Sequence, residues 1–306
     1  MNKELDVTVV ILTFNEELHI RRCLENVCSI AQKVYVVDCH STDRTQEICG
    51  EYGNVEVVER DWPGNQAEQF NWAIDNLKIN TEWILRLDAD EYLMPELVEE
   101  LQQRLPTINK DITGIEFKRR HIFMGQWVKH GIYPVILLRM FKTGCGRYDN
   151  RLMDEHIILS RGKSIVFNHD FCDHSLINIS DYCRKHINYA QREATEVLDA
   201  VYGLSGTMED EKGLGEQAKE KHKKKGAYNQ LPLFWRSFAY FAYRYILKGG
   251  FLDGKAGFLF AYIQGWWYRT LVDAKIMEAE NACGTDKRKL IEYIRCNFGI
   301  DLSAPR

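Results

Sequence analysis

Long uncharged apolar runs and paired cysteine motifs are both absent from this sequence of 306 residues. No stretch of about 18 apolar residues runs without a charge, so we expect no membrane-spanning helix. The nine cysteines form no C-x-x-C pair and the N-terminus does not resemble a secretory signal peptide, so we expect reduced thiols in a cytosolic setting. The net charge of -4, from 40 basic and 44 acidic residues, argues against a nucleic-acid-binding protein.

Strand and helix patterns alternate through the first half of the chain. Apolar, β-branched runs occupy residues 7–13, 33–38, 55–60 and 82–87, and each precedes a segment with helical spacing. This alternation predicts an α/β fold, a mostly parallel sheet with flanking helices. In open sheets of this kind, ligands bind beyond the carboxyl ends of the strands.

Later changes in composition divide the chain into four predicted parts. Residues 112–170 switch to short strands and turns but stay within a first domain of residues 1–202. A Gly- and Lys-rich flexible linker follows at 203–226, then a pair of basic, aromatic helices at 227–282 and a polar tail at 283–306. Helix starts are predicted at Asn15, at Asp43 with Gln46, and at Ser180.

Three acidic residues stand together in WILRLDADEYL (83–93), at the end of the fourth predicted strand. Asp88, Asp90 and Glu91 repel one another unless a cation or hydrogen bonds compensate their charges. In an extended chain Asp88 and Asp90 lie about 6–7 Å apart, so one could hold a divalent cation while the other reaches a ribose. Oxygen ligands of this kind suit Mn²⁺ or Mg²⁺. For the tripeptide alone, an acidic loop without a ligand is the stronger alternative.

Polar motifs after the other strands fall on the same edge of the predicted sheet. TFNEE follows the first strand, VVDCHSTDRT the second and LDADE the fourth. In this series the sequence resembles family 2 glycosyltransferases of the GT-A fold. FMGQWVKHGIYPVILLRMF, DEHI and HSLINISDYCRKHINYAQREA are similar to motifs of a subgroup that includes lipopolysaccharide core glucosyltransferases.

This resemblance implies an inverting, metal-dependent hexosyltransferase whose first domain binds a nucleotide sugar, UDP-linked and with glucose as the first candidate. It implies that Asp38 contacts the nucleobase, that Asp90 holds the metal and that Asp88 lies near the ribose. Glu155 is expected as the base, with Asp154, which stands where the subgroup has histidine, as the alternative. The other implied contacts are Thr13, Asn15, Glu16 and Asp43 for the nucleotide, Arg139 and Lys185 for the diphosphate, and His174 for the metal.

Each of these assignments has a simpler alternative. Glu155 could be a surface acid, His174 a histidine bonded to backbone, and Lys185 or Arg139 a solvated charge. Phe70 precedes Asn71 where the family carries a basic residue, so one diphosphate contact is missing or supplied elsewhere. Processive members of the superfamily carry Q-x-x-R-W, whereas Gln264 is followed by GWWYR, which favours transfer of one sugar per encounter.

The C-terminal helices combine basic and aromatic residues. Residues 221–248 hold seven Lys or Arg and no acid. Such a segment is typical of a helix in a membrane interface, and core or dimer-interface helices are the alternative. The predicted membrane contacts are Trp235, Phe238, Phe241, Trp266 and Trp267.

The expected partners are a nucleotide-sugar donor, a lipid-linked or envelope glycan acceptor and a membrane surface, with a homodimer as an alternative use of the apolar helices. The expected location is cytoplasmic, peripheral on the inner face of a bacterial inner membrane. Two other functions stay open. A non-catalytic nucleotide-binding membrane adaptor would bind without turnover, and a sugar nucleotidyltransferase would need a Gly-rich loop where TFNEELHIRR has no glycine.

Overall fold

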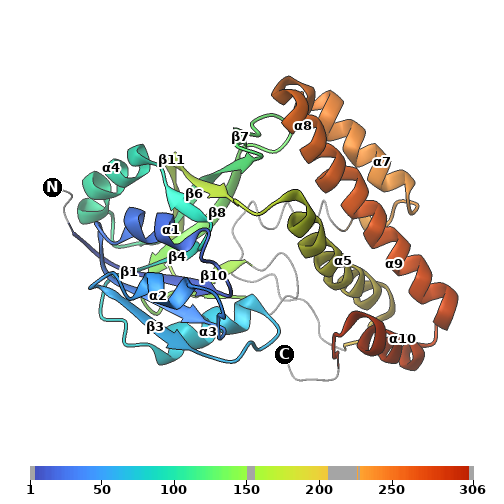
Figure 1. Ribbon diagram of the computed structural model, residues 1–306, viewed down its shortest axis with the longest axis horizontal. Coiled ribbons are helices and arrows are strands. Elements are labelled where there is room, and N and C mark those ends of the chain that lie inside the picture. The colour runs from blue at the N-terminus through green and yellow to red at the C-terminus, as the bar shows by residue number, and fades with distance from the viewer. Residues whose placement is uncertain (1–3, 150–155, 206–225, 227, 303–306) are drawn as a thin grey trace.

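The computed structural model describes residues 4–149, 156–205, 226 and 228–302, arranged as a sheet domain and a helical region (Figure 1). The sheet runs in the order β3-β2-β1-β4-β8-β6-β11-β5, with β7 beside β6, and β9 and β10 form a separate hairpin. The strands are β1 (Leu5–Thr13), β2 (Ala31–Asp38), β3 (Val55–Glu59), β4 (Trp83–Asp88), β5 (Glu91–Leu93), β6 (Ile112–Phe123), β7 (Gln126–Trp127), β8 (Val135–Lys142), β9 (Gly146–Tyr148), β10 (Ile157–Leu159) and β11 (Lys163–His174).

The first four strands of the sheet are parallel, as the alternating pattern predicts. Beyond β4 the sheet becomes mixed, because β8 is antiparallel to both β4 and β6, while β11 is parallel to β6. The prediction of short strands over 112–170 is confirmed for β7, β9 and β10 but was wrong for β6 and β11, which each have 12 residues. Charged residues within them pair across the strands, Arg120 with Asp170 at 3.0 Å and Arg119 with Asp173 at 3.5 Å, which hides their strand pattern in the sequence.

Helices cover both faces of the sheet. α1 (Ile20–Val27), α2 (Thr45–Cys49) and α4 (Pro95–Arg104) close one hydrophobic core, and α3 (Gln66–Asn76) closes the other together with β9 and β10. Asn15 does not begin α1: it takes a positive φ of 56° in the preceding turn. Asp43 accepts a hydrogen bond from the backbone N–H of Thr45 at the start of α2, but Gln46 does not complete a capping box.

The helical region begins with α5 (Ile179–Tyr202), which is capped by Asn178 and not by Ser180. α5 packs against α9 (Tyr268–Cys283) through residues such as Ala194 and Val272, and its Tyr182 packs against Phe123 at the end of β6, so α5 contacts both parts of the molecule. The remaining elements are α7 (Trp235–Ala242), η2 (Tyr243–Leu247), η3 (Gly250–Asp253), α8 (Gly254–Phe260), η4 (Ala261–Trp267), α10 (Lys287–Tyr293) and η5 (Ile294–Phe298).

The C-terminal segment expected as a polar tail is folded. Leu290 on α10 and Ile294 on η5 are fully buried against α5 and α9, because apolar residues at helical spacing give this short segment a core-facing side. Most of the predicted linker, residues 206–225, lies outside the described part of the chain. Within that part, no helix combines the length and the hydropathy needed to cross a membrane. All nine cysteines are free thiols, as predicted.

Candidate active site

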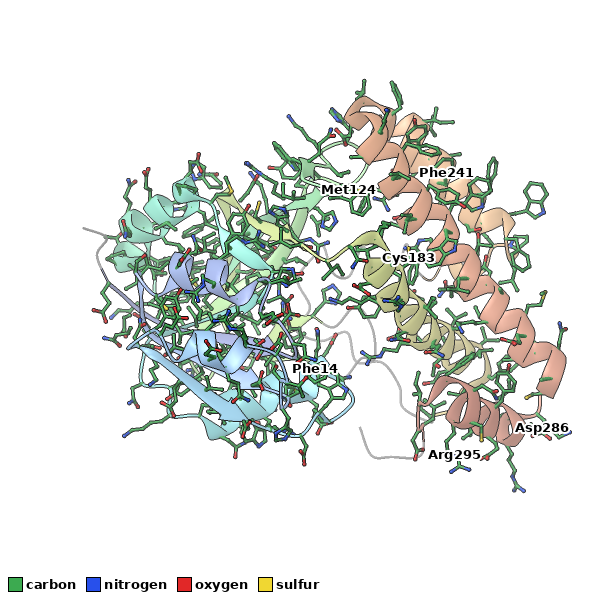
Figure 2. All side chains as sticks on the ribbon, viewed as in Figure 1. Phe14, Met124, Cys183, Phe241, Asp286 and Arg295 are labelled. Carbon is green, nitrogen blue, oxygen red and sulfur yellow. The ribbon has the colours of Figure 1, made fainter. Side chains whose placement is uncertain are left out.

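The strand register brings the three polar motifs to one edge of the sheet. Thr13 at the end of β1 pairs with Asp38 at the end of β2, and Leu12 pairs with Asp88 at the end of β4. The loops that follow these strands therefore meet, as the alternating sequence predicts. Figure 2 shows Phe14, which directly follows β1, at the edge of the sheet domain that faces α5.

Asp38 is fully buried at this edge and accepts four hydrogen bonds. Oδ1 accepts from the backbone N–H of Ser41 at 2.7 Å and from Gln46 Nε2 at 2.8 Å. Oδ2 accepts from the hydroxyls of Thr13 at 2.7 Å and Ser41 at 2.6 Å. Burial opposes ionisation, but these bonds hold the pKa of Asp38 below its usual value. Since no part of Asp38 is solvent-exposed, the nucleobase contact implied by the family resemblance is not available in this arrangement.

The loops after β1 and β2 are joined to each other by the remaining residues of the predicted nucleotide site. Asn15 Oδ1 accepts from the backbone N–H of Thr42 at 2.8 Å, and the backbone N–H of Glu16 donates to Thr45 Oγ1 at 2.8 Å. Asp43 Oδ2 accepts from the backbone N–H of Glu17 at 3.0 Å. The structure thus brings Thr13, Asn15, Glu16, Asp38 and Asp43 together, as a rim whose internal bonds fix its shape.

The crowded acids after β4 are compensated by two buried arginines. Arg86 Nη2 lies 2.6 Å from Asp88 Oδ1, and Arg139 Nη2 pairs with Glu91 Oε1. Glu91 Oε2 also accepts from the backbone N–H of Asp88 at 2.9 Å. Burial opposes ionisation of Asp88, but Arg86 and Arg139 hold its pKa below the usual value, whereas burial raises the pKa of Glu91 to about 7.

These contacts correct the prediction for Arg139. Its side chain is buried against Glu91 and Asp88, so it neutralises acids inside the protein and does not face a diphosphate. Sequence inspection did not single out Arg86, although its charge stands in the middle of an otherwise apolar strand. A charge at a position buried on both faces is a signal for a buried acidic partner.

Asp90 is the acid that remains uncompensated. Its half-buried side chain receives no hydrogen bond and no ion pair from any residue within the described ranges. Burial, together with the carboxylates of Asp173 and Asp88, raises its pKa to about 6. An unpaired carboxylate among other acids is a favourable place for a divalent cation, whose charge would relieve the repulsion.

The donor set near Asp90 fits a cation that is shared with a phosphate ligand. Across the described residues, no three His, Cys, Asp or Glu side chains converge as a complete metal site. Mn²⁺ and Mg²⁺ bound beside phosphates commonly take one or two protein carboxylates and leave their other positions to phosphate oxygens and water. Asp90 therefore fits such a cation as its anchoring carboxylate.

His174 fits this metal poorly. Arg22 Nη1 lies 3.0 Å from its Nδ1, and because arginine only donates, Nδ1 must accept. A neutral His174 then carries its proton on Nε2, which leaves no lone pair there for a metal. Arg22 Nη2 also donates to the carbonyl oxygens of His174 at 2.5 Å and Asp90 at 3.2 Å, so Arg22 holds the two backbones together. Arg22, which the sequence did not reveal, explains the position of His174 without a metal.

Lys185 extends from α5 into the electrostatic field of these acids. Desolvation opposes its charge, but Tyr189 and the carboxylates of Asp90, Glu16 and Asp88 raise its pKa above the usual value. Lys185 is exposed and forms no ion pair with a described residue. Its Nζ lies 5.9 Å from the centroid of the Tyr189 ring, so the ammonium group is held on α5 near these acids, and its contact with a diphosphate stays a prediction.

The third motif supports the other side of the site. Phe70, where the family has a basic residue, is fully buried against Phe141 and Tyr148. Asn71 exchanges hydrogen bonds with the backbone of Tyr148 on β9. The predicted base Glu155 and its alternative Asp154 lie outside the described residues, in the segment that connects β9 to β10.

The predicted membrane contacts gather mainly on one surface of the C-terminal helices. Trp235 is 73% exposed and Phe238 is 44% exposed. Phe241 and Trp266 are half-buried and stack with ring centroids 5.4 Å apart. Trp267 differs, because its half-buried ring packs against the core residues of α5 and α9 and is not part of this surface.

A mixed α/β sheet with flanking helices and an acidic D-x-D motif at its ligand-binding edge is the architecture of GT-A glycosyltransferases. The sequence model for glycosyl transferase family 2 matches residues 8–173, which is more than half of the chain. The chain belongs to this family, so the class of sugar nucleotidyltransferases is set aside.

Similar proteins agree with this family. An uncharacterised glycosyltransferase of Rickettsia bellii is 28% identical over 298 residues, covering 92% of this chain and 90% of that protein. The lipopolysaccharide core biosynthesis glycosyltransferase LpsC of Rhizobium meliloti is 27% identical over 154 residues, covering 49% of this chain and 55% of LpsC. The mannosyltransferase PcManGT of Pyrobaculum calidifontis, solved with GDP-Man and Mn²⁺, superposes with a TM-score of 0.50 at 17% identity, over 90% of this chain and 87% of that one. The last likeness concerns the fold alone.

Proposed function

We propose that this glycosyltransferase is inverting and non-processive, and that it moves one sugar from a nucleotide sugar to a lipid-linked or cell-envelope glycan. A UDP-sugar is the proposed donor, with glucose as the first sugar to test. The observation that carries the proposal is that Asp90 and Lys185 lie near each other without forming an ion pair. They are opposite charges close enough to shift each other's pKa, and neither takes part in an ion pair with a described residue.

A nucleoside diphosphate satisfies both charges at once. Asp90 would anchor Mn²⁺ or Mg²⁺, and when bound this ion would supply positive charge to the leaving diphosphate. Lys185 would bind diphosphate oxygens from the α5 side, which replaces the basic residue missing before Asn71. Asp88, with 32% of its side chain exposed and its position fixed by Arg86, would face the ribose.

The nucleoside would lie on the rim formed after β1 and β2. Because Asp38 is buried with four hydrogen bonds, we propose that it positions Thr13 and Ser41 and does not itself contact the base. Phe14 is 58% exposed beside them and offers an aromatic face for stacking. Asn15, Glu16 and Asp43 would set the shape of this rim through the backbone bonds described above.

The proposed base is Glu155, with Asp154 as the alternative. The carboxylate would take the proton of the acceptor hydroxyl while that oxygen forms a bond to C1 of the sugar. The bond between C1 and the diphosphate oxygen breaks on the opposite face, which inverts the configuration. This assignment rests on the resemblance of DEHI (154–157) to the family motif.

The acceptor and the location are proposed from the helical region and from the name of one relative. LpsC acts in lipopolysaccharide core biosynthesis, which favours an envelope glycan as the acceptor. The exposed aromatic side chains around Trp235 and Phe238 favour association with a lipid surface. We therefore propose a peripheral enzyme on the cytoplasmic face of a bacterial inner membrane.

Release of nucleoside diphosphate tests the proposal. UDP- and GDP-sugars would be supplied with and without Mn²⁺ or Mg²⁺, in a membrane extract that contains endogenous acceptors. We expect metal-dependent turnover of one UDP-sugar, strongly reduced in Asp90→Asn and Glu155→Gln and retained in Glu99→Gln, which removes an exposed acid on α4. Turnover of a GDP-sugar in preference would contradict the donor. Metal-dependent UDP binding without turnover of any donor would instead favour the non-catalytic adaptor.

A further inference from the structure

A cavity of about 450 Å³ lies away from the predicted residues, between the loop of residues 129–134 and the turn η2. Its walls carry the cations Lys129, Arg244 and Lys248 and the aromatic side chains of Tyr133, Tyr240 and Tyr243. No acidic residue lines it. Figure 1 shows the neighbouring strand β7 beside the end of the helical region that carries α8.

The walls of this cavity are built by close contacts. Gly131 has a φ of +85°, and a Cβ at this position would lie 2.9 Å from the carbonyl oxygen of Arg244. Asp253 holds the same loop to the helices, because it accepts from the backbone N–H of His130 at 2.7 Å and lies 2.6 Å from His130 Nδ1. The loop and η2 therefore keep a fixed separation.

Arg244 is the strongest indication of a ligand. Arg244 is only 7% exposed, and its buried Nε has no hydrogen-bond partner. Arg244 takes part in no ion pair among the described residues, and its guanidinium instead lies over the rings of Tyr240 at 5.5 Å and Phe260 at 5.3 Å. Burial lowers its pKa. A buried cation without an acid is costly, and an anion in the cavity would relieve that cost.

Exposed apolar side chains adjoin the cavity on η2 and η3. Ile246 and Leu247 are 59% and 77% exposed, and Phe251 and Leu252 are 51% and 61% exposed. The cavity, with its three cations, could take an anionic head, and the exposed apolar residues beside it, which do not line the cavity, could take an apolar chain. An inorganic anion would use only the cavity.

We propose that this cavity binds the phosphate group of an amphiphilic molecule, a lipid phosphate whose apolar chain lies against Ile246, Leu247, Phe251 and Leu252. Its phosphate oxygens would accept from Lys129, Arg244 and Lys248 and from the hydroxyl of Tyr243, since the hydroxyl of Tyr133 already donates to Asp170. The idea that this lipid is the acceptor, or belongs to the membrane that carries the acceptor, rests on the proposed function. The binding of a lipid phosphate in the cavity does not.

Contacts connect the cavity with the acids of the candidate active site. Arg244 lies over the ring of Phe260, whose centroid is 4.8 Å from that of His121. His121 Nδ1 lies 3.1 Å from Asp173 Oδ2, and Asp173 is one of the carboxylates that, after burial, raise the pKa of Asp90. A chain of direct contacts therefore links the wall of the cavity to an acid that acts on Asp90.

Calorimetric titration of the full chain with lysophosphatidic acid below its micelle concentration tests the inference. We expect the double variant Lys129→Ala/Lys248→Ala to bind at least about tenfold more weakly than wild type. The matched variant Lys110→Ala/Lys289→Ala, which removes two exposed lysines elsewhere, should stay within about twofold. Arg244→Gln should also weaken binding and Arg244→Lys should restore part of it, with thermal unfolding confirming that both variants fold.

The remaining outcomes would overturn the inference or its choice of a lipid phosphate over a free phosphate. Equal affinity of the two double variants, or equal binding of lysophosphatidylcholine, would overturn the inference. Inorganic phosphate that binds as tightly as lysophosphatidic acid would overturn its lipid half. UDP affinity in the presence of Mn²⁺, measured on the same samples, reports the donor site separately. If wild type binds the lipid but does not bind UDP, the result would contradict the proposed function and not this inference.

Discussion

Asn71 on α3 and Tyr148 on β9 exchange two hydrogen bonds: Asn71 Nδ2 donates to the carbonyl oxygen of Tyr148 at 3.1 Å, and the N–H of Tyr148 donates to Asn71 Oδ1 at 2.9 Å. Both residues are buried. This pair fixes the strand that leads into residues 150–155, where the proposed base lies. Asn71 therefore acts through the position of another segment and not through contact with substrate.

Replacing Asn71 with alanine should lower both stability and turnover. The variant removes both buried hydrogen bonds between Asn71 and the backbone of Tyr148, so we expect a loss of about 2–3 kcal/mol in the free energy of unfolding. We also expect kcat to fall more than the KM for the donor changes, because Asn71 contacts β9 and not the nucleotide rim. Urea denaturation and steady-state kinetics would measure the two effects. Asn76→Ala, which removes one exposed bond on the same helix, is the control.

Arg139 and Lys185 should behave in opposite ways when changed to alanine. Arg139→Ala removes the nearest cation of the buried Glu91 and leaves only Arg86, whose Nη1 lies 3.8 Å from Glu91 Oε2, so we expect about 3–5 kcal/mol of lost stability. Lys185→Ala removes an exposed cation, so we expect near-normal stability and weaker binding of UDP with Mn²⁺. Thermal unfolding and UDP titration would separate the two. Arg147→Ala, which breaks the exposed pair with Asp75, is the control for loss of an arginine.

The hydrogen bond from Arg22 to His174 gives a prediction for metal binding. Asp90→Ala should abolish Mn²⁺ binding in the presence of UDP. His174→Ala should weaken it only about two- to fivefold, because the imidazole is not a ligand and Arg22 still bonds to the carbonyl oxygens of both residues. Mn²⁺ titration followed by electron paramagnetic resonance would measure both affinities. A loss of about 100-fold or more in His174→Ala would instead identify His174 as a ligand.

The sequence predicted what depends on neighbours along the chain and missed what depends on distant partners. The parallel strands and the meeting of Thr13, Asp38 and Asp88 follow from local patterns and from the direction of the strands. The pairing of Arg139 with Glu91 joins residues 48 positions apart, and that of Arg22 with His174 joins residues 152 apart. No local pattern shows which acid a distant arginine meets, so Arg139 was assigned to a ligand and Arg22 was overlooked.

The same limit applies to the helices. Apolar spacing predicted α5, but the side chains that cap a helix compete over two or three neighbouring positions, and Asn178 replaced Ser180. The aromatic residues of the C-terminal helices were recognised as a group. Whether a given ring faces outward, as Trp235 does, or packs inward, as Trp267 does, depends on the position of α5.

The depressed pKa of Asp38 predicts how the stability of the nucleotide rim depends on pH. Hydrogen bonds to its charged form lower its pKa from 3.8, so its contribution to stability is complete above that value and is lost as the pH falls through the folded-state pKa. Asp38→Asn lacks this titration, and its amide group would face the donors of Ser41 or Gln46. We therefore expect the variant to be about 1–3 kcal/mol less stable than wild type at pH 7.

The gap between wild type and Asp38→Asn should narrow as the pH falls below about 4, because protonation removes the advantage of the carboxylate in wild type. Urea denaturation of both proteins at a series of pH values would measure it, and taking the difference cancels acid effects that the two proteins share. Asp75→Asn, at an exposed position on α3, should show a small gap at every pH. A gap for Asp38→Asn that is constant across the range would mean that hydrogen bonds to the charged carboxylate do not stabilise the rim.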